Sequence, residues 1–211
     1  MRVREPTRVL ALRHGRTAWN AEARIQGQLD VPLDAVGRWQ AERVAEALAD
    51  EDLGAIYSSD LQRALATAQP LAARTGARLQ TDVRLRERGF GSFEGRTYAD
   101  IEATWPEAAL RWRQREVDFR PGGGEALTPF YARCVDAVCA RAAAHPGQTI
   151  AVVAHGGVLD CLYRAAVGVG LTAPRSWLLG NASINRLLFN GERLSLVGWS
   201  DDAHLDGAPG V

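Results

Sequence analysis

The chain lacks lysine, has a single methionine and contains no apolar run long enough to cross a bilayer. Because such a run is missing at the amino terminus as well, we expect a cytoplasmic protein without a membrane partner. Net charge is also missing, since 25 basic residues balance 25 acidic ones. This balance gives no long-range attraction for nucleic acid, so we expect no nucleic-acid partner. Any bound anion must then be held by a local arrangement of arginines.

Cysteine is scarce, with Cys134, Cys139 and Cys161 forming an odd set of three. They lie in apolar helical patterns and lack the spacing of metal ligands. The sequence therefore predicts reduced core thiols, no metal site and no cofactor. A linker rich in proline, glycine or serine is absent too, which predicts one domain over residues 1–211. We expect a monomer or a homodimer.

Segments typical of strands and of helices alternate along the chain. Apolar runs at residues 9–12 and 150–153 indicate buried parallel strands, and Asn190-Gly191 predicts a tight turn between antiparallel strands at about 183–189 and 194–199. Further strands are expected at 55–57 and 78–83, and helices across 41–48, 61–72, from Pro106, and across 127–142. Ser59-Asp60-Leu61-Gln62 matches a capping box that would open the second helix. We predict an α/β fold: a three-layer sandwich with a mostly parallel central sheet, an antiparallel edge strand and helices on both faces.

Two histidines follow the two most apolar predicted strands. His14, in Arg13-His14-Gly15, follows residues 9–12, and His155, in Ala154-His155-Gly156-Gly157, follows residues 150–153. Ligands of open α/β sheets bind beyond the carboxyl ends of the strands. The sequence therefore predicts that His14 and His155 face each other across one crevice.

Arg63 falls in the first turn of a predicted helix, where the helix dipole disfavours a cation. Helix amino termini bind anions, so an arginine at this position suits a docked phosphate. With Arg13, Asn20 and the two histidines, Arg63 supplies cationic and amide donors for three phosphoryl oxygens. Glu87 adds a carboxyl group that could protonate the oxygen leaving a phosphate ester, which would otherwise depart as a very basic alkoxide.

These residues resemble the histidine phosphatase superfamily, the phosphoglycerate-mutase-like fold, and its phosphatase-type branch in particular. The resemblance extends over nearly the whole chain, in five blocks that follow the family's order. The blocks are Arg13-His14-Gly15-Arg16-Thr17-Ala18-Trp19-Asn20 with Gln26-Gly27 and Pro32-Leu33; Ser58-Ser59-Asp60-Leu61-Gln62-Arg63-Ala64 with Thr67-Ala68; Glu87 with Gly91 and Glu94-Gly95; Ala154-His155-Gly156-Gly157; and Asn181-Ala182-Ser183-Ile184-Asn185.

The resemblance implies a role for each site residue. It makes His14 the nucleophile that becomes a phosphohistidine, and Arg13, Arg63 and His155 the groups that hold the equatorial oxygens. Glu87 would protonate the leaving oxygen and then activate water. The resemblance also implies substrate-side positions for a further set: Asn20, Thr17, Gln26, Gly27 and Gly156.

Three activities are compatible with this set of residues. We favour a metal-independent phosphomonoester hydrolase that acts on a small phosphorylated metabolite. A cofactor-dependent phosphoglycerate mutase is the alternative, but mutases of the family carry a longer insertion after the acid, with a carboxylate-gripping lysine where Tyr98 falls here. A catalytically weak protein that binds a phosphorylated ligand is the third, although binding alone would need neither His14 nor Glu87.

Substrate specificity is expected to reside in residues 97–125, where Tyr98, Trp105, Trp112 and Arg113 could line the approach. The remaining histidines lack a strand-end context. We expect His145 to lie at the surface and His204 in a solvated carboxyl-terminal tail. The sequence does not identify the physiological ester.

Overall fold

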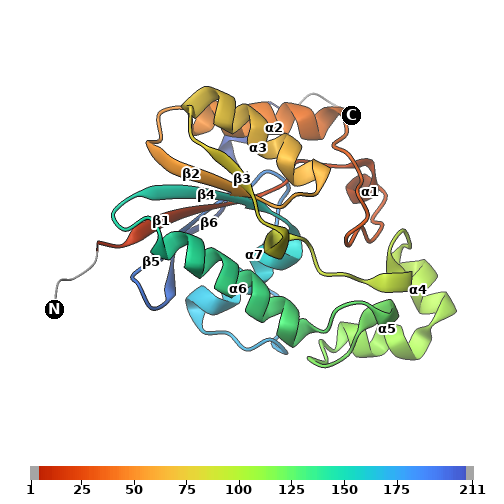
Figure 1. Cartoon of the computed structure of the whole chain (residues 1–211). Helices are drawn as coiled ribbons and strands as arrows, with labels where there is room; N and C mark the ends of the chain where they lie inside the picture. Colours follow the sequence, from red (N-terminus) through yellow and green to blue (C-terminus); the bar gives the residue numbers. More distant parts are fainter. Residues whose placement is uncertain (1–4, 208–211) are drawn as a thin grey trace.

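A six-stranded sheet forms the middle of the protein, with strand order β3-β2-β4-β1-β5-β6 (Figure 1). In the computed structural model, which describes residues 5–207, the strands are β1 (Thr7–Arg13), β2 (Leu53–Ser58), β3 (Leu79–Thr81), β4 (Thr149–Ala154), β5 (Ile184–Phe189) and β6 (Leu194–Asp201). Strands β1 to β4 pair in parallel, and β5 and β6 run antiparallel. The predicted mostly parallel sheet with an antiparallel edge is confirmed, and two strands make that edge.

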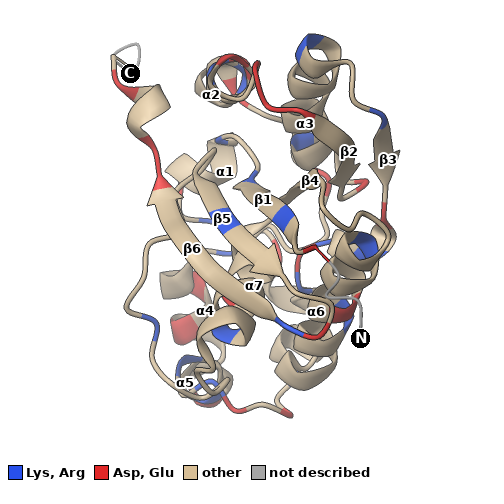
Figure 2. Cartoon of the chain, turned by 90° about the vertical axis from the view of Figure 1, so that its left-hand side faces the viewer, with Lys and Arg blue, Asp and Glu red and all other residues tan. Residues whose placement is uncertain are grey.

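Helices cover both faces of the sheet, as predicted, with α2 and α3 on one side and α6 and α7 on the other (Figure 2). The helices are α1 (Ala18–Ala21), α2 (Ala35–Ala47), α3 (Gln62–Thr75), α4 (Tyr98–Thr104), α5 (Pro106–Arg113), α6 (Leu127–Ala143) and α7 (Gly156–Val167). The short helices α1, α4 and α5 lie toward the end of the sheet where β1 ends (Figure 1). Acidic and basic segments are interspersed along the ribbon in Figure 2, in keeping with the balanced charge.

The apolar strand β1 is buried on both faces because its side chains alternate between two cores. Val9 and Ala11 join the cluster under α6 and α7, whereas Leu10 and Leu12 join the cluster under α2 and α3. Such a doubly covered strand is typical of a parallel sheet and explains why the run shows no polar alternation.

The start of α3 differs from the predicted capping box. Its N-cap residue is Leu61, which makes no side-chain cap, and the backbone N–H of Gln62 donates to the Asp30 carboxylate at 2.7 Å. Ser59 lies too early to cap the helix at its third position, and its hydroxyl group instead contacts the His155 ring. The capping box was therefore wrong, because the helix begins at Gln62; the Ser59 hydroxyl oxygen also accepts from the Leu61 backbone N–H at 3.3 Å, ahead of the first turn.

Residues 97–125 share a small separate core with two residues from outside the stretch. Ile101 and Ala109 are buried there with Ile25 and Phe93, and Trp105 and Trp112 pack against them. Pro106 stands at the start of α5, as its fixed φ favours. The predicted strand at 78–83 is shorter than expected, at Leu79–Thr81.

The three cysteines are free thiols on helices, as predicted. Cys134 and Cys161 are buried between α6 and α7, where burial raises the pKa of Cys161. Within residues 5–207 every helix is too short or too polar to span a bilayer. The single-domain organisation over residues 1–211 stays a prediction.

Candidate active site

His14 and His155 lie side by side because β1 and β4 are neighbours. The parallel register pairs Arg13 with Ala154, so the residue that follows each strand emerges at the same end of the sheet. The two imidazole centroids are 5.2 Å apart, and both rings are buried. The two rings lie side by side, as predicted, and among residues 5–207 it is His14 that lines the cleft while His155 is buried behind it.

The hydrogen bonding of His14 defines its tautomer. Its Nδ1 atom lies 2.7 Å from the Gly15 carbonyl oxygen, which can only accept a hydrogen bond. Nδ1 therefore carries the hydrogen, and Nε2 presents a lone pair. Burial, reinforced by the Arg63 and Arg13 cations, lowers the pKa of His14 well below its ordinary value. A neutral ring with a free Nε2 is the form that a nucleophile requires.

His155 has the complementary arrangement. Its Nε2 atom lies 2.8 Å from the Ser59 hydroxyl oxygen, and within residues 5–207 its buried Nδ1 atom has no hydrogen-bond partner. When the Ser59 hydroxyl, whose oxygen accepts from the Leu61 backbone N–H at 3.3 Å, donates to Nε2, the ring carries its hydrogen on Nδ1. Burial lowers the pKa of His155 well below its ordinary value, with Arg63 as the next cause. His155 is therefore a neutral donor beside His14.

Arg63 and Arg13 each have one guanidinium N–H group, on Nε, without a protein partner among residues 5–207. Arg63 donates from its Nη atoms to the carbonyl oxygens of Leu29 at 2.8 Å and Gly27 at 2.7 Å, and Arg13 donates from Nη1 to that of Leu179. In the described part of the chain, the buried Nε atoms of both arginines remain without a partner. A buried polar atom without a partner is costly unless a ligand satisfies it.

Burial affects the charge of these arginines but does not remove it. It lowers the pKa of Arg13 to about 10, with Glu87 opposing the shift and Arg175 and Arg63 adding to it. Burial likewise lowers the pKa of Arg63. Both guanidinium groups stay protonated near neutral pH, so the three unpartnered N–H groups of Arg13, Arg63 and His155 form an anion site beside His14.

Glu87 is held at the amino terminus of α7. One carboxylate oxygen accepts from the backbone N–H of Gly157 at 2.9 Å, and the other from the backbone N–H of Arg88 at 2.8 Å. A Cβ atom at Gly157 would lie 2.2 Å from the carboxylate, so the close approach requires glycine. Glu87 and Gly156 both line the cleft in front of His14.

Arg133 on α6 positions the backbone of the Glu87 loop. Its guanidinium group donates to the carbonyl oxygens of Arg84 and Arg86 at 2.8 Å and to that of Glu87 at 3.0 Å. Glu125 accepts from the same guanidinium group at 2.7 Å and 2.8 Å. Sequence reasoning missed Arg133, because the carbonyl groups that it holds lie more than 40 residues away and nothing local marks it.

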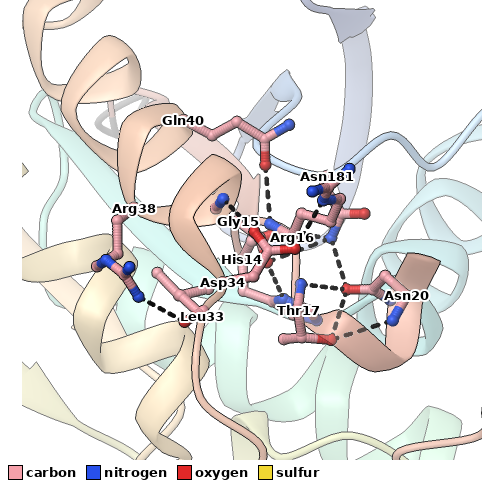
Figure 3. Close-up of polar contacts among 11 residues, drawn as sticks. His14, Gly15, Arg16, Thr17, Asn20, Leu33, Asp34, Arg38, Gln40 and Asn181 are labelled. Atoms are coloured by element: carbon pink, nitrogen blue, oxygen red, sulfur yellow. Dashed lines mark hydrogen bonds and ion pairs between the residues drawn. The ribbon is translucent and has the colours of Figure 1, made fainter. Parts of the chain in front are cut away.

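The loop after β1 is tied together by amides, as Figure 3 shows. The Asn20 side-chain oxygen accepts from the Thr17 backbone at 3.1 Å and from the Asn181 amide at 3.2 Å, and Asn181 also donates to the His14 carbonyl oxygen at 3.0 Å. Asn20 therefore has its side-chain nitrogen left to offer a ligand, and it lines the cleft. Thr17 is fully buried and caps α1, which places it behind the loop and outside the cleft lining.

Gln26 and Gly27 occupy the cleft wall beside Arg63. Gln26 is buried, and within residues 5–207 its side-chain oxygen has no partner. Gly27 adopts a positive φ of 53°, and its carbonyl oxygen accepts from Arg63. Gly27 thus contributes through its backbone, by orienting the arginine.

The cleft has a volume of about 780 Å³ and an aromatic rim. Tyr98 and Trp112 stack with centroids 5.1 Å apart and an interplanar angle of 8°. Arg113 also lines the cleft, as expected, but Trp105 packs behind it. Trp177 lines the cleft as well.

The two remaining histidines differ from their predicted settings. His145 is half-buried and contacts the Tyr57 hydroxyl group at 2.8 Å, so the prediction of a surface residue was only partly right. His204 is half-buried, and its Nε2 atom lies 3.1 Å from the Ala182 carbonyl oxygen. Its predicted place in a solvated tail was wrong, because the chain after β6 packs on α2, where Arg43 donates to the His204 carbonyl oxygen.

Comparisons with known proteins agree with this arrangement. The chain is 42% identical over 203 residues to phosphoglycerate mutase-like protein 4 of Arabidopsis thaliana, covering 94% of this chain and 86% of that protein. It is 37% identical over 204 residues to the metal-independent phosphoserine phosphatase of Arabidopsis thaliana, covering 95% and 84%. The solved structure of a mycobacterial glucosyl-3-phosphoglycerate phosphatase with VO3 superposes with a TM-score of 0.82 at 37% identity, covering 92% of this chain and 99% of that one.

The family to which the chain belongs follows from a match to a family model over most of the chain. The profile of the histidine phosphatase superfamily (branch 1) matches residues 9–202, which include every strand and helix that lines the cleft. The chain therefore belongs to the histidine phosphatase superfamily.

Proposed function

We propose that this phosphomonoester hydrolase works through a phosphohistidine at His14, without a metal ion, on a small phosphorylated metabolite. Hydrolysis of phosphate monoesters is the activity named for its phosphatase relatives. The observation that carries the mechanism is the set of three buried, unpartnered N–H donors that surrounds the His14 ring. Three fixed donors match the three equatorial oxygens of a phosphoryl group in transfer.

In the first step, the Nε2 atom of His14 attacks phosphorus and forms a P–N bond while the P–O bond to the alcohol breaks. Arg13, Arg63 and His155 hold the equatorial oxygens, and their charges stabilise the transition state. Glu87, in its protonated form, gives its proton to the leaving oxygen, so that a neutral alcohol departs.

In the second step, Glu87 is a carboxylate and takes a proton from a water molecule. The oxygen of that water attacks phosphorus, and the P–N bond breaks to release inorganic phosphate and neutral His14. Because attack and departure occur at the same fixed site, one set of donors serves both steps. Glu87 lines the same cleft as His14, and two backbone N–H groups hold its carboxyl group there.

Mutase activity is less well supported. The stretch between Glu87 and α6 is short, and Tyr98 stands where mutases of the family carry a lysine. A mutase must keep its intermediate in place for return transfer. With 3-phosphoglycerate and catalytic 2,3-bisphosphoglycerate, we expect inorganic phosphate to appear faster than the 2-isomer.

We also infer that the chain forms one domain and acts as a monomer or homodimer. A cytoplasmic location is inferred as well, and the three free thiols support it. Bound small ligands in solved relatives, VO3 among them, support a small phosphorylated metabolite as substrate.

The covalent step is tested by trapping the intermediate. Rapid quenching of the wild type should yield a phosphoryl group that is labile in acid and stable in base, as a phosphoramidate is. His14→Ala should abolish this species and turnover of p-nitrophenyl phosphate, while the variant stays folded by circular dichroism. Turnover by folded His14→Ala would refute the covalent mechanism, and a wild type without turnover between pH 5 and 8 would favour the binding protein.

A further inference from the structure

The arginines of the cleft differ in how they are paired. Seven of them line it: Arg13, Arg24, Arg63, Arg88, Arg113, Arg115 and Arg175. The first six donate to carboxylate or carbonyl oxygens of the protein. For Arg175, residues 5–207 supply neither a hydrogen bond nor an ion pair. Arg175 is exposed at the cleft, so its guanidinium group is open to a ligand.

The segment that carries Arg175 is fixed on both sides. Before it, Arg164 donates to the Ala173 carbonyl oxygen at 2.9 Å. After it, the Trp177 ring stacks on Tyr163 with centroids 4.1 Å apart, and Trp199 donates to the Leu178 carbonyl oxygen at 2.8 Å. The backbone on both sides of Arg175 is therefore held in place beside the cleft.

Arg175 and Tyr98 on α4 line the same cleft as Arg13 and His14. The charge of Arg175 adds to the lowering of the pKa of Arg13, and it opposes the raised pKa that burial gives to Tyr98. The Tyr98 hydroxyl group stays protonated at neutral pH and can donate a hydrogen bond, although 61% of the residue's surface is accessible. Stacking on Trp112 sets the direction of its ring.

We propose that Arg175 and the Tyr98 hydroxyl group bind a second anionic group, carried by the alcohol part of the substrate. A guanidinium group and a phenol together suit a carboxylate or a second phosphate, since both groups accept from two donors. The site that cleaves the ester lies at the bottom of the cleft, and this second site lies at its rim. The inference rests on the proposed function, because the leaving alcohol must extend from His14 toward the rim.

The test compares matched esters. Wild type and Arg175→Ala are assayed with 3-phosphoglycerate and glycerol 3-phosphate, which differ by a carboxylate, and with fructose 1,6-bisphosphate and fructose 6-phosphate, which differ by a phosphate. We expect the wild type to prefer the more anionic member of at least one pair. In that pair, Arg175→Ala should lower the preference in kcat/KM by about tenfold, and Arg175→Lys should lower it less because the charge remains. Whichever pair responds identifies the anion.

Arg111→Ala is the matched control. Arg111 lies on α5 outside the cleft lining and is paired with Glu116 at 2.7 Å, so its removal should leave the preference at the wild-type ratio. Equal ratios in wild type and Arg175→Ala for both pairs would overturn the proposal. An equal loss on all four esters would also overturn it, because Arg175 would then act on the cleaved phosphate. If the wild type hydrolyses none of these esters and no p-nitrophenyl phosphate, the proposed function fails instead.

Discussion

Gly157→Ala is a small change with a large expected effect on the general acid. The added Cβ atom would lie 2.2 Å from Oε1 of Glu87 and 3.0 Å from Cζ of Phe130. Ordinary van der Waals contact between such atoms needs about 3.4 Å or more, so the carboxyl group must move by about 1 Å. Phe130 closes the other side, and Gly157 lies inside a helix, which limits relief by backbone movement.

A displacement of about 1 Å in a reacting group can cost on the order of 10²-fold in rate. We therefore expect Gly157→Ala to lower kcat/KM for glycerol 3-phosphate about 10²-fold, because this alkoxide needs a proton to leave. The loss should be smaller with p-nitrophenyl phosphate, whose leaving group needs little help. Circular dichroism and the Tm should show that the variant is folded.

Gly156→Ala is the control in the neighbouring residue. A Cβ atom there would lie 3.5 Å from Nε of Arg13, an ordinary contact, and the backbone N–H is kept. We expect a loss of less than about tenfold with either ester. Wild-type activity of Gly157→Ala on glycerol 3-phosphate, or equal losses for the two glycine variants, would refute the close-packing argument for Glu87.

The remaining predictions concern the charged groups of the site. Arg13→Ala and Arg63→Ala should each lower kcat/KM by about 10²-fold or more, since each removes a preorganised donor. EDTA should leave the activity of the wild type unchanged. A strong loss of activity with EDTA that one divalent metal reverses would show that the reaction depends on a metal ion. Glu87→Gln should slow alkyl esters severely and spare p-nitrophenyl phosphate, and a uniform loss across leaving groups would argue against an acid role. Because burial lowers the pKa of His14 and His155 in the folded state, the unfolded chain binds protons first as the pH falls below 6.5. The free energy of unfolding should then decrease from pH 6.5 toward pH 5, by up to about 1.4 kcal/mol per pH unit for each histidine. Urea titrations of wild type and His14→Gln should show a shallower decrease in the variant, and identical slopes would contradict the linkage.

Much of the architecture was predictable from local pattern. The strands at residues 9–12 and 150–153 are apolar throughout because both faces of the parallel sheet are covered, and Asn190-Gly191 marked the hairpin. The pairing of His14 with His155 followed from the same strands, since parallel neighbours end at one edge of a sheet. The sites of Arg63 and Glu87 rested on motif spacing, and their roles stay predictions.

Other features depended on contacts between distant segments. Ser59 was predicted to cap α3, but in the folded chain it contacts His155, nearly 100 residues away. His204 was expected in solvent, yet it packs beside Ala182.

The sequence by itself determined the order of strands and helices along the chain, because each follows from a local period. It also determined the sheet edge that carries the site and the residue types at that edge, because these follow from the chemistry of short motifs. Only the tertiary structure decided which donors are already satisfied. It showed that Arg133 holds the Glu87 loop, that Arg13 and Arg63 keep a free Nε atom, and that Arg175 is unpaired among residues 5–207. The physical reason is that a hydrogen bond depends on distance and direction between two groups, and for these arginines the partner groups are brought close only by the packing of the whole chain.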